Sequence, residues 1–178
     1  MMDTHRLLSR AAGIKRLLTT LLVLLGAAVP GSLIYAAFYR PAFERVLIEA
    51  IGYPNATLAL WQFGALLALA VVHILALAVT LWHGRQVFAE LLAERIERAA
   101  HHARKVSMWL WGLVGYSIFA HTTAVLTVTW TFPEGERALA ISLSSVQVST
   151  VLAALMASLF AQALQLGAEL WRDHKEVI

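Results

Sequence analysis

The sequence predicts an all-α polytopic membrane protein, built as a bundle of four transmembrane helices with short interfacial amphipathic helices. Of its 178 residues, 60% are hydrophobic and only 14% are charged, whereas soluble domains are about half apolar and about a quarter charged. A globule of this size cannot bury so large an apolar fraction, because its surface is large relative to its volume. Four runs are also long enough to cross a bilayer core of about 30 Å, which takes about 20 helical residues.

The four apolar runs predict membrane helices over residues 17–38, 58–82, 106–130 and 138–167. None of these runs contains an acidic or basic residue other than histidine. Because no water inside a bilayer can hydrogen-bond a strand edge, each run is expected to be helical. Residues 1–178 are therefore expected to form one transmembrane domain.

Lysine and arginine residues gather in the segments that would lie on one side of the bilayer. Eleven fall in the N-terminal segment, between the second and third runs, or in the C-terminal tail: Arg6, Arg10, Lys15, Arg16, Arg85, Arg95, Arg98, Arg104, Lys105, Arg172 and Lys175. Only Arg40, Arg45 and Arg137 fall on the other side. Since cytoplasmic segments carry the excess of Lys and Arg, both termini are expected in the cytoplasm. The expected location is the bacterial inner membrane, in a multi-pass protein.

The net charge of +3 is small and arises near the membrane ends. It therefore indicates contact with the lipid bilayer and gives no sign of direct nucleic-acid binding. The absence of cysteine excludes disulfides, thiolate metal sites and thiol catalysis. The membrane runs also lack a carboxylate pair, a phosphate loop and a nucleophile elbow. We therefore expect no enzymatic activity and no catalytic residues.

Two segments between the runs show helical apolar spacing. After Pro41, which suits a first helical turn, apolar residues recur until Gly52 and predict a short surface helix on the outer side. On the inner side, Gly84 is the only strong helix breaker between Trp82 and Gly112, so we expect the chain to reverse there. An amphipathic helix would follow, with one apolar stripe made of Phe88, Leu91, Leu92, Ile96, Ala99 and Ala103.

His73 and His121 are the only ionisable residues deep within the predicted membrane helices. Such residues are candidates for function because polarity at that depth costs free energy. Hydrogen-bonded packing is one interpretation, and axial ligation of a b-type haem is another. The two residues would differ in depth by about 9 Å, from a rise of about 1.5 Å per residue, which disfavours a shared haem. No cofactor is therefore expected in the preferred interpretation.

Other polar residues are expected to act in packing. His101 and His102 precede Arg104 and Lys105, but neighbouring positions on a helix point about 100° apart, so no metal site is expected there. The fourth run carries a stripe of small and polar residues, which suits close packing between helices: Ser144, Gln147, Ala154, Ser158, Ala161, Gln162 and Gln165. A polar path or an oligomer interface along this stripe is the alternative.

Two stretches carry a family resemblance. They are residues 84–88, with the sequence GRQVF, and residues 168–178, with the sequence AELWRDHKEVI. Over roughly Leu77 to Ile178 the chain resembles the family of uncharacterised bacterial membrane proteins called DUF2975. This resemblance implies four membrane helices, a glycine-to-phenylalanine turn after the second helix and a short acidic tail that ends in a β-branched residue. The tail of this chain is less acidic than that pattern, because it contains Arg172, His174 and Lys175. It also implies a regulatory or sensing role beside small helix-turn-helix regulators.

The sequence therefore predicts a non-enzymatic inner-membrane protein with an interaction, regulatory or sensing role through its cytoplasmic face. The charged residues expected to contact a cytoplasmic protein partner are Arg95, Arg98, Glu169, Arg172 and Asp173. One alternative is a haem-binding electron-transfer protein that uses His73 and His121. Another is an accessory subunit of a larger membrane complex, and a homo-oligomer is also open.

Overall fold

The computed structural model describes residues 4–54, 56–133 and 145–176. Over these residues it contains five helices and no strand: α1 (Thr4–Phe38), α2 (Arg40–Ile51), α3 (Leu60–Leu92), α4 (Ile96–Thr129) and α5 (Ser145–Glu176). Four of them, α1, α3, α4 and α5, are long and apolar enough to cross a membrane. The all-α class and the four long apolar helices are thus confirmed. Residues 138–144 of the fourth predicted helix lie outside the described residues.

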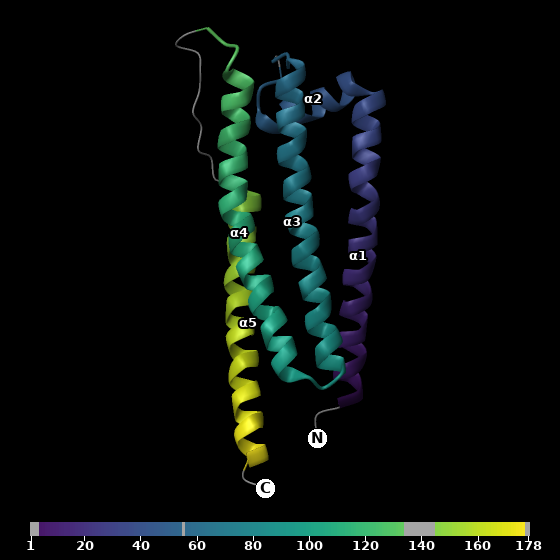
Figure 1. Cartoon of the computed structure of the whole chain (residues 1–178), viewed down its shortest axis with the longest axis vertical. Coiled ribbons are helices and arrows are strands. Elements are labelled where there is room, and N and C mark those ends of the chain that lie inside the picture. The colour runs from purple at the N-terminus through teal and green to yellow at the C-terminus, as the bar shows by residue number, and fades with distance from the viewer. Residues whose placement is uncertain (1–3, 55, 134–144, 177–178) are drawn as a thin grey trace.

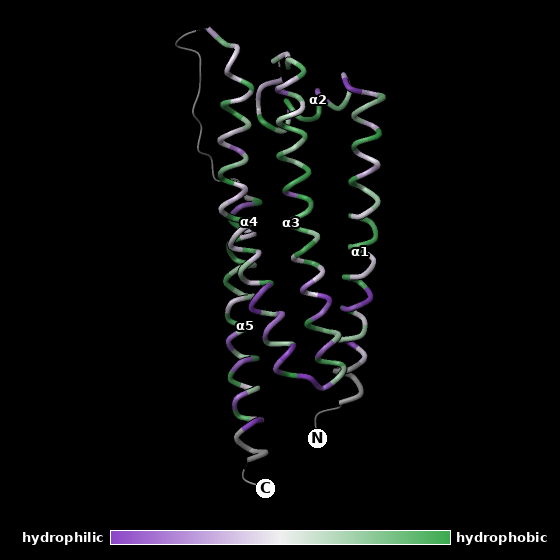
Figure 2. The backbone as a smooth tube through the Cα atoms, viewed as in Figure 1, coloured by the Kyte–Doolittle hydropathy of each residue, from purple (hydrophilic) through white to green (hydrophobic). Residues whose placement is uncertain are grey.

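The long helices pack in the order in which they occur along the chain. α3 lies between α1 and α4, and α5 packs along α4 (Figure 1). The short α2 crosses between the ends of α1 and α3, and we call that end of the molecule the α2 end. The start of α1, the α3–α4 turn and the end of α5 lie together at the opposite end, the hairpin end (Figure 1). Hydrophilic residues are concentrated around this hairpin end (Figure 2).

The chain does not reverse at Gly84, so that prediction was wrong. α3 continues through Gly84 to Leu92, and the reversal occurs at Ala93, Glu94 and Arg95. A glycine inside a helix costs only about 1 kcal/mol relative to alanine, and packing of α3 against α1 outweighs that cost. A Cβ at Gly84 would lie 3.8 Å from Leu18 Cδ1 of α1, an ordinary contact.

The predicted inner amphipathic helix is also wrong as a single element. Its apolar stripe is divided between the last turns of α3 and the first turns of α4. Val87 of α3 faces Ala99 and Ala103 of α4, and Ala161 of α5 completes the same buried cluster. The helical spacing was real, but a helical hairpin buries two short stripes against each other as readily as one helix buries one long stripe.

The true turn places a non-glycine residue at positive φ. Glu94 has a φ of 59°, and the Arg95 N–H donates to the carbonyl of Glu90 at 2.9 Å. The left-handed region costs an L residue about 1–2 kcal/mol. Glu94→Gly is therefore expected to raise the free energy of unfolding by about 0.5–1 kcal/mol, after the entropy of an unfolded glycine is subtracted.

Thermal unfolding of purified protein in one detergent measures this change. The matched control is Gly84→Ala, which has room for its Cβ and is expected to be neutral or mildly stabilising. A less stable Glu94→Gly protein would show that side-chain contacts of Glu94, and not its backbone, decide the turn.

The predicted short helix after Pro41 is confirmed as α2. Pro41 lies in its first turn, and Gly52 ends it with a φ of 92°, which favours glycine. Two charged residues of α2 secure the start of α3, because Glu44 Oε1 accepts a hydrogen bond from the Leu58 N–H at 2.8 Å and Arg40 donates to the Leu58 carbonyl at 3.3 Å. The Arg40 guanidinium also lies 5.4 Å from the ring centroid of Phe63.

Hydrogen bonds between side chains join the long helices at several levels. Arg85 Nε of α3 donates to Thr19 Oγ1 of α1 at 3.1 Å. Ser107 of α4 and Ser158 of α5 share a hydrogen bond of 2.6 Å between their hydroxyls. In the predicted stripe of α5, Gln147, Ala154 and Ala161 are buried and Ser158 is bonded, which supports its packing role. Gln162 is exposed instead, and Ser144 lies outside the described residues.

Candidate functional site

The predicted partner-binding residues lie together at the hairpin end. Arg95 and Arg98, at the start of α4, and Arg172, near the end of α5, line one surface pocket of about 420 Å³. Glu169 and Arg172 line a second pocket of about 350 Å³ between α4 and α5. Asp173 belongs to α5, but its side chain lies outside the described part of the chain.

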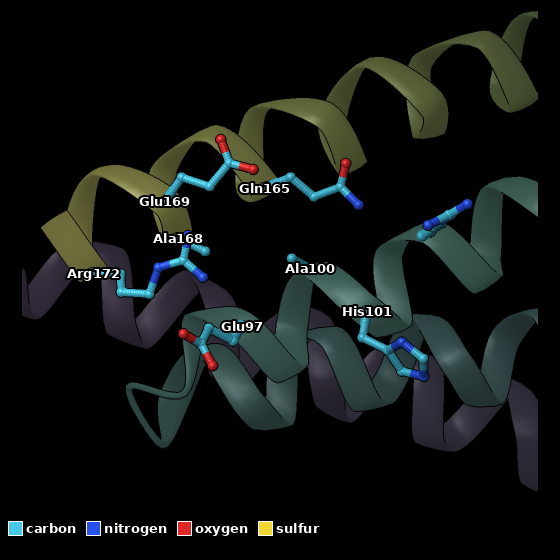
Figure 3. Close-up of a pocket in the computed structure, with 8 residues that line it drawn as sticks. Glu97, Ala100, His101, Gln165, Ala168, Glu169 and Arg172 are labelled. Carbon is cyan, nitrogen blue, oxygen red and sulfur yellow. The ribbon is translucent and has the colours of Figure 1, made fainter.

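The two pockets share lining residues and form one continuous surface, which we call the hairpin groove. Glu97, Ala168 and Arg172 line both pockets. Arg172 extends from α5 into the space between α5 and α4, and Glu97 and His101 lie on α4, the facing helix (Figure 3). Small side chains at Ala100 and Ala168 keep the groove open between the two helices.

Most charged side chains that line the hairpin groove form no ion pair within the described part of the protein. Arg95 Nη1 lies 3.8 Å from Glu90 Oε2, and the Arg95 side chain is 58% exposed, so this ion pair contributes little stability. Across the described ranges 4–54, 56–133 and 145–176, no ion pair joins Glu97, Arg98 or Arg172 to another side chain. These charges remain available to a molecule that docks from outside.

A histidine pair lies next to the hairpin groove. His83 Nδ1 of α3 lies 3.1 Å from His102 Nδ1 of α4, a distance at which one ring donates and the other accepts. His83 is 7% exposed, and Trp82 packs beside it with ring centroids 5.2 Å apart. The sequence pattern drew attention to His102 only beside His101 and gave no signal for His83. Residues 83 and 102 come together because the chain reverses near residue 94.

The histidine pair lies beyond the apolar part of the helices. α3 and α4 have 33 and 34 residues, so each is about 50 Å long and exceeds a bilayer core of about 30 Å. The excess falls at the hairpin end, outside the predicted membrane segments 58–82 and 106–130. Burial lowers the pKa of both histidines below the usual 6.5. Their mutual repulsion and the charge of Lys105 lower the pKa of His83 further, and His101 and Lys105 do so for His102.

His73 and His121 line one cavity in the apolar part of the protein. This cavity of about 300 Å³ lies among α2, α3, α4 and α5, and Ser117 and Gln147 also line it. A second cavity of about 300 Å³ shares His73, Ser117 and Gln147 with the first. We call the two together the His73 cavity. The predicted difference in depth therefore does not separate the two histidines, because the cavity extends along the helices.

A haem between these two histidines would need room for a flat macrocycle between α3 and α4. The His73 ring instead packs against Tyr116, with centroids 5.9 Å apart. The Tyr116 hydroxyl donates to the Leu69 carbonyl at 2.8 Å, so α3 and α4 are in direct contact beside His73. Among the described residues no group of three or more His, Asp or Glu could hold a metal ion. Haem binding stays a prediction that this packing does not favour.

Comparison of the chain with protein-family models, with curated proteins and with solved structures finds no match. The resemblance to the DUF2975 family therefore stays a prediction. Function is therefore inferred from the geometry of the hairpin groove, the histidine pair and the His73 cavity.

Proposed function

We propose that this chain is a non-enzymatic multi-pass protein of the bacterial inner membrane. In this proposal α1, α3, α4 and α5 cross the bilayer, and both termini lie in the cytoplasm. The hairpin end, also in the cytoplasm, binds a protein partner in a regulatory or sensing role. The observation that carries the proposal is the gathering of Arg95, Arg98 and Arg172 around one groove whose charges are largely unpaired.

The charge distribution supports the orientation. The start of α1, the α3–α4 turn and the end of α5 share the hairpin end (Figure 1), and these segments carry most of the Lys and Arg residues. Reporter fusions after Ile178 and within the turn at residues 93–95 are both expected to report cytoplasm. A fusion in α2, after Arg45, is the control and should report the opposite side. A periplasmic signal from either of the first two would refute the orientation.

The groove is suited to a protein partner because it presents both signs of charge on two rigid helices. Arg95, Arg98 and Arg172 offer three cations, while Glu94 and Glu97 offer anions between them. Complementary charges of this kind determine specificity and association rate more than they determine affinity. Apolar contact is also available, since Ile96 and Ala168 line the same pocket.

Charge reversal tests this surface. The double variant Arg95→Glu with Arg98→Glu is expected to insert and fold normally, because exposed substitutions change stability by about 0.5 kcal/mol or less. Recovery of the partner after crosslinking in cells is expected to fall about tenfold, which corresponds to about 1.4 kcal/mol. The matched control is Arg45→Glu, an exposed arginine at the α2 end. Equal recovery of the partner with the unmodified protein, the double variant and Arg45→Glu, at matched protein levels, would contradict a docking role for the groove.

One observation favours the accessory-subunit alternative. The apolar window of α1 has no buried residue within the protein, so α1 is anchored by one face and offers the rest to its surroundings. Lipid can cover that surface, and so can helices of a larger complex. A complex recovered in mild detergent that depends on α1 surface residues such as Val23 and Leu24, and not on Arg95 and Arg98, would favour this alternative.

A further inference from the structure

The His73 cavity combines an apolar lining with a few polar groups from three different helices. His73 comes from α3, Ser117 and His121 from α4, and Gln147 from α5. In the first part of the cavity the remaining lining is aliphatic, as at Leu66 and Val146, and the second part adds the hydroxyls of Ser149 and Thr150. A cavity of a few hundred Å³ with a small number of placed polar groups is the usual form of a small-molecule site.

His73 is not satisfied by the protein. Within the part of the chain that the structure describes, its ring makes the aromatic contact with Tyr116 but no hydrogen bond. His73 lies 13 residues after Leu60, the first residue of α3, and so about 20 Å from the α2 end of that helix. This places His73 near the middle of a bilayer. A polar group at this depth costs free energy unless it finds a partner. A molecule in the cavity can be that partner.

The position and lining of the cavity restrict the chemistry of that molecule. It has to dissolve in the membrane, because the walls are mainly apolar and Val146, which lines both parts of the cavity, is 69% exposed on the outside of the helices. It also has to carry a hydrogen-bonding group, because a neutral imidazole has one N–H donor and one acceptor nitrogen. The ring N–H can donate a hydrogen bond to a carbonyl oxygen, and the other ring nitrogen can accept one from a phenolic hydroxyl.

The spacing of the polar residues suits two oxygens on one ring. Ser117 and His121 are one turn apart on the same face of α4, a rise of about 6 Å, while His73 and Gln147 reach the cavity from neighbouring helices. The Ser117 hydroxyl donates to the Val114 carbonyl at 2.9 Å, so toward a ligand it acts as an acceptor, for example for a quinol hydroxyl. We propose that the His73 cavity binds the ring of a membrane-soluble quinone or quinol, with its oxygens toward these polar groups and its tail leaving past Val146. The proposal concerns binding alone and does not rest on the partner proposed for the hairpin groove.

Direct binding tests the proposal. Full-length protein in lipid nanodiscs is titrated with a radiolabelled 1,4-benzoquinone that carries a ten-carbon tail, and with the alkylbenzene of equal tail length. The quinone is expected to bind at least tenfold more tightly than the alkylbenzene. Equal affinities would overturn the proposal and show an apolar site that accepts any lipid tail.

Two variants locate the site. His73→Leu is expected to weaken quinone binding at least tenfold, and Ala120→Phe, which fills the cavity, is expected to abolish it. His101→Leu, an exposed histidine at the hairpin end, is the matched control and should bind as the unmodified protein does. Unchanged binding by Ala120→Phe would overturn the proposal even if His73→Leu failed to fold.

Two further outcomes separate this inference from the other hypotheses. The double variant Arg95→Glu with Arg98→Glu should keep full quinone binding, so failure of the partner proposal leaves this one standing. A Soret absorption band in the purified protein that His121→Ala removes would overturn the quinone proposal and support the haem alternative.

Discussion

Replacement of Gln62 by leucine is expected to lower the free energy of unfolding by about 2–3 kcal/mol. Gln62 is fully buried at 0% exposure, and its amide makes two hydrogen bonds. Its Oε1 accepts from the Ala59 N–H at 2.7 Å, and its Nε2 donates to the Thr127 carbonyl at 2.6 Å. The first bond caps the start of α3, and the second satisfies a carbonyl in the last turn of α4. Each buried group left unpaired costs about 1–3 kcal/mol.

Thermal unfolding in a single detergent measures the effect, with Gln162→Leu as the matched control. Gln162 is exposed on α5, so its replacement should change stability by about 0.5 kcal/mol or less. If Gln62→Leu were as stable as the control, Gln62 would not join the two helix ends in solution.

The second large effect is expected on acidification. The histidine pair shares a hydrogen bond only while at least one ring is neutral, since a doubly protonated pair has donors alone. Burial and neighbouring charge hold the pKa of His83 and of His102 below 6.5, so the unfolded chain binds protons more readily than the folded one. The stabilisation is therefore fully present above pH 6.5 and is lost as the pH falls from 6.5 through the lower pKa values of the folded state.

The measurement is the melting temperature as a function of pH between neutral and mildly acidic values. The double variant His83→Asn with His102→Asn is expected to show a clearly smaller decrease below pH 6.5 than the unmodified protein. His101→Asn, which replaces an exposed ring in the same region, should keep the full decrease. A decrease of equal size in the double variant would mean that other groups cause the acid sensitivity.

The sequence predicted the long helices well because their signal is strong and local. Each run lacks charge over more than twenty residues, and a bilayer allows such a run little besides a helix. α2 was predicted for a similar reason, since Pro41 and Gly52 mark its two ends. What failed was the position of the reversal. Gly84 is the stronger breaker by residue type, yet packing against Leu18 and the contacts of Val87 favour a helix that continues to Leu92.

The position of this turn accounts for most of the differences between the predicted and the observed candidate sites. With a turn at residue 84, His83 would lie at the turn itself. His102 would then lie several turns further along the next helix, and the two rings would be far apart in space. With the turn at Glu94, residues 83 and 102 lie at the same level of a hairpin and their rings meet at 3.1 Å. The link from Gln62 to the Thr127 carbonyl and the links from Arg40 and Glu44 to Leu58 were also missed, because these partners are backbone groups distant in sequence.

The sequence by itself determined the all-α class, the four long apolar helices and the concentration of charge at one end. Hydropathy and charge are summed over neighbouring residues. They therefore predict membrane spans and orientation without any knowledge of tertiary contacts. Only the tertiary structure decided the position of the hairpin turn, the meeting of His83 with His102, and the joint lining of one cavity by His73 and His121. Those features depend on the register between packed helices, which is fixed by side-chain contacts across helices and leaves little trace in any single run of residues.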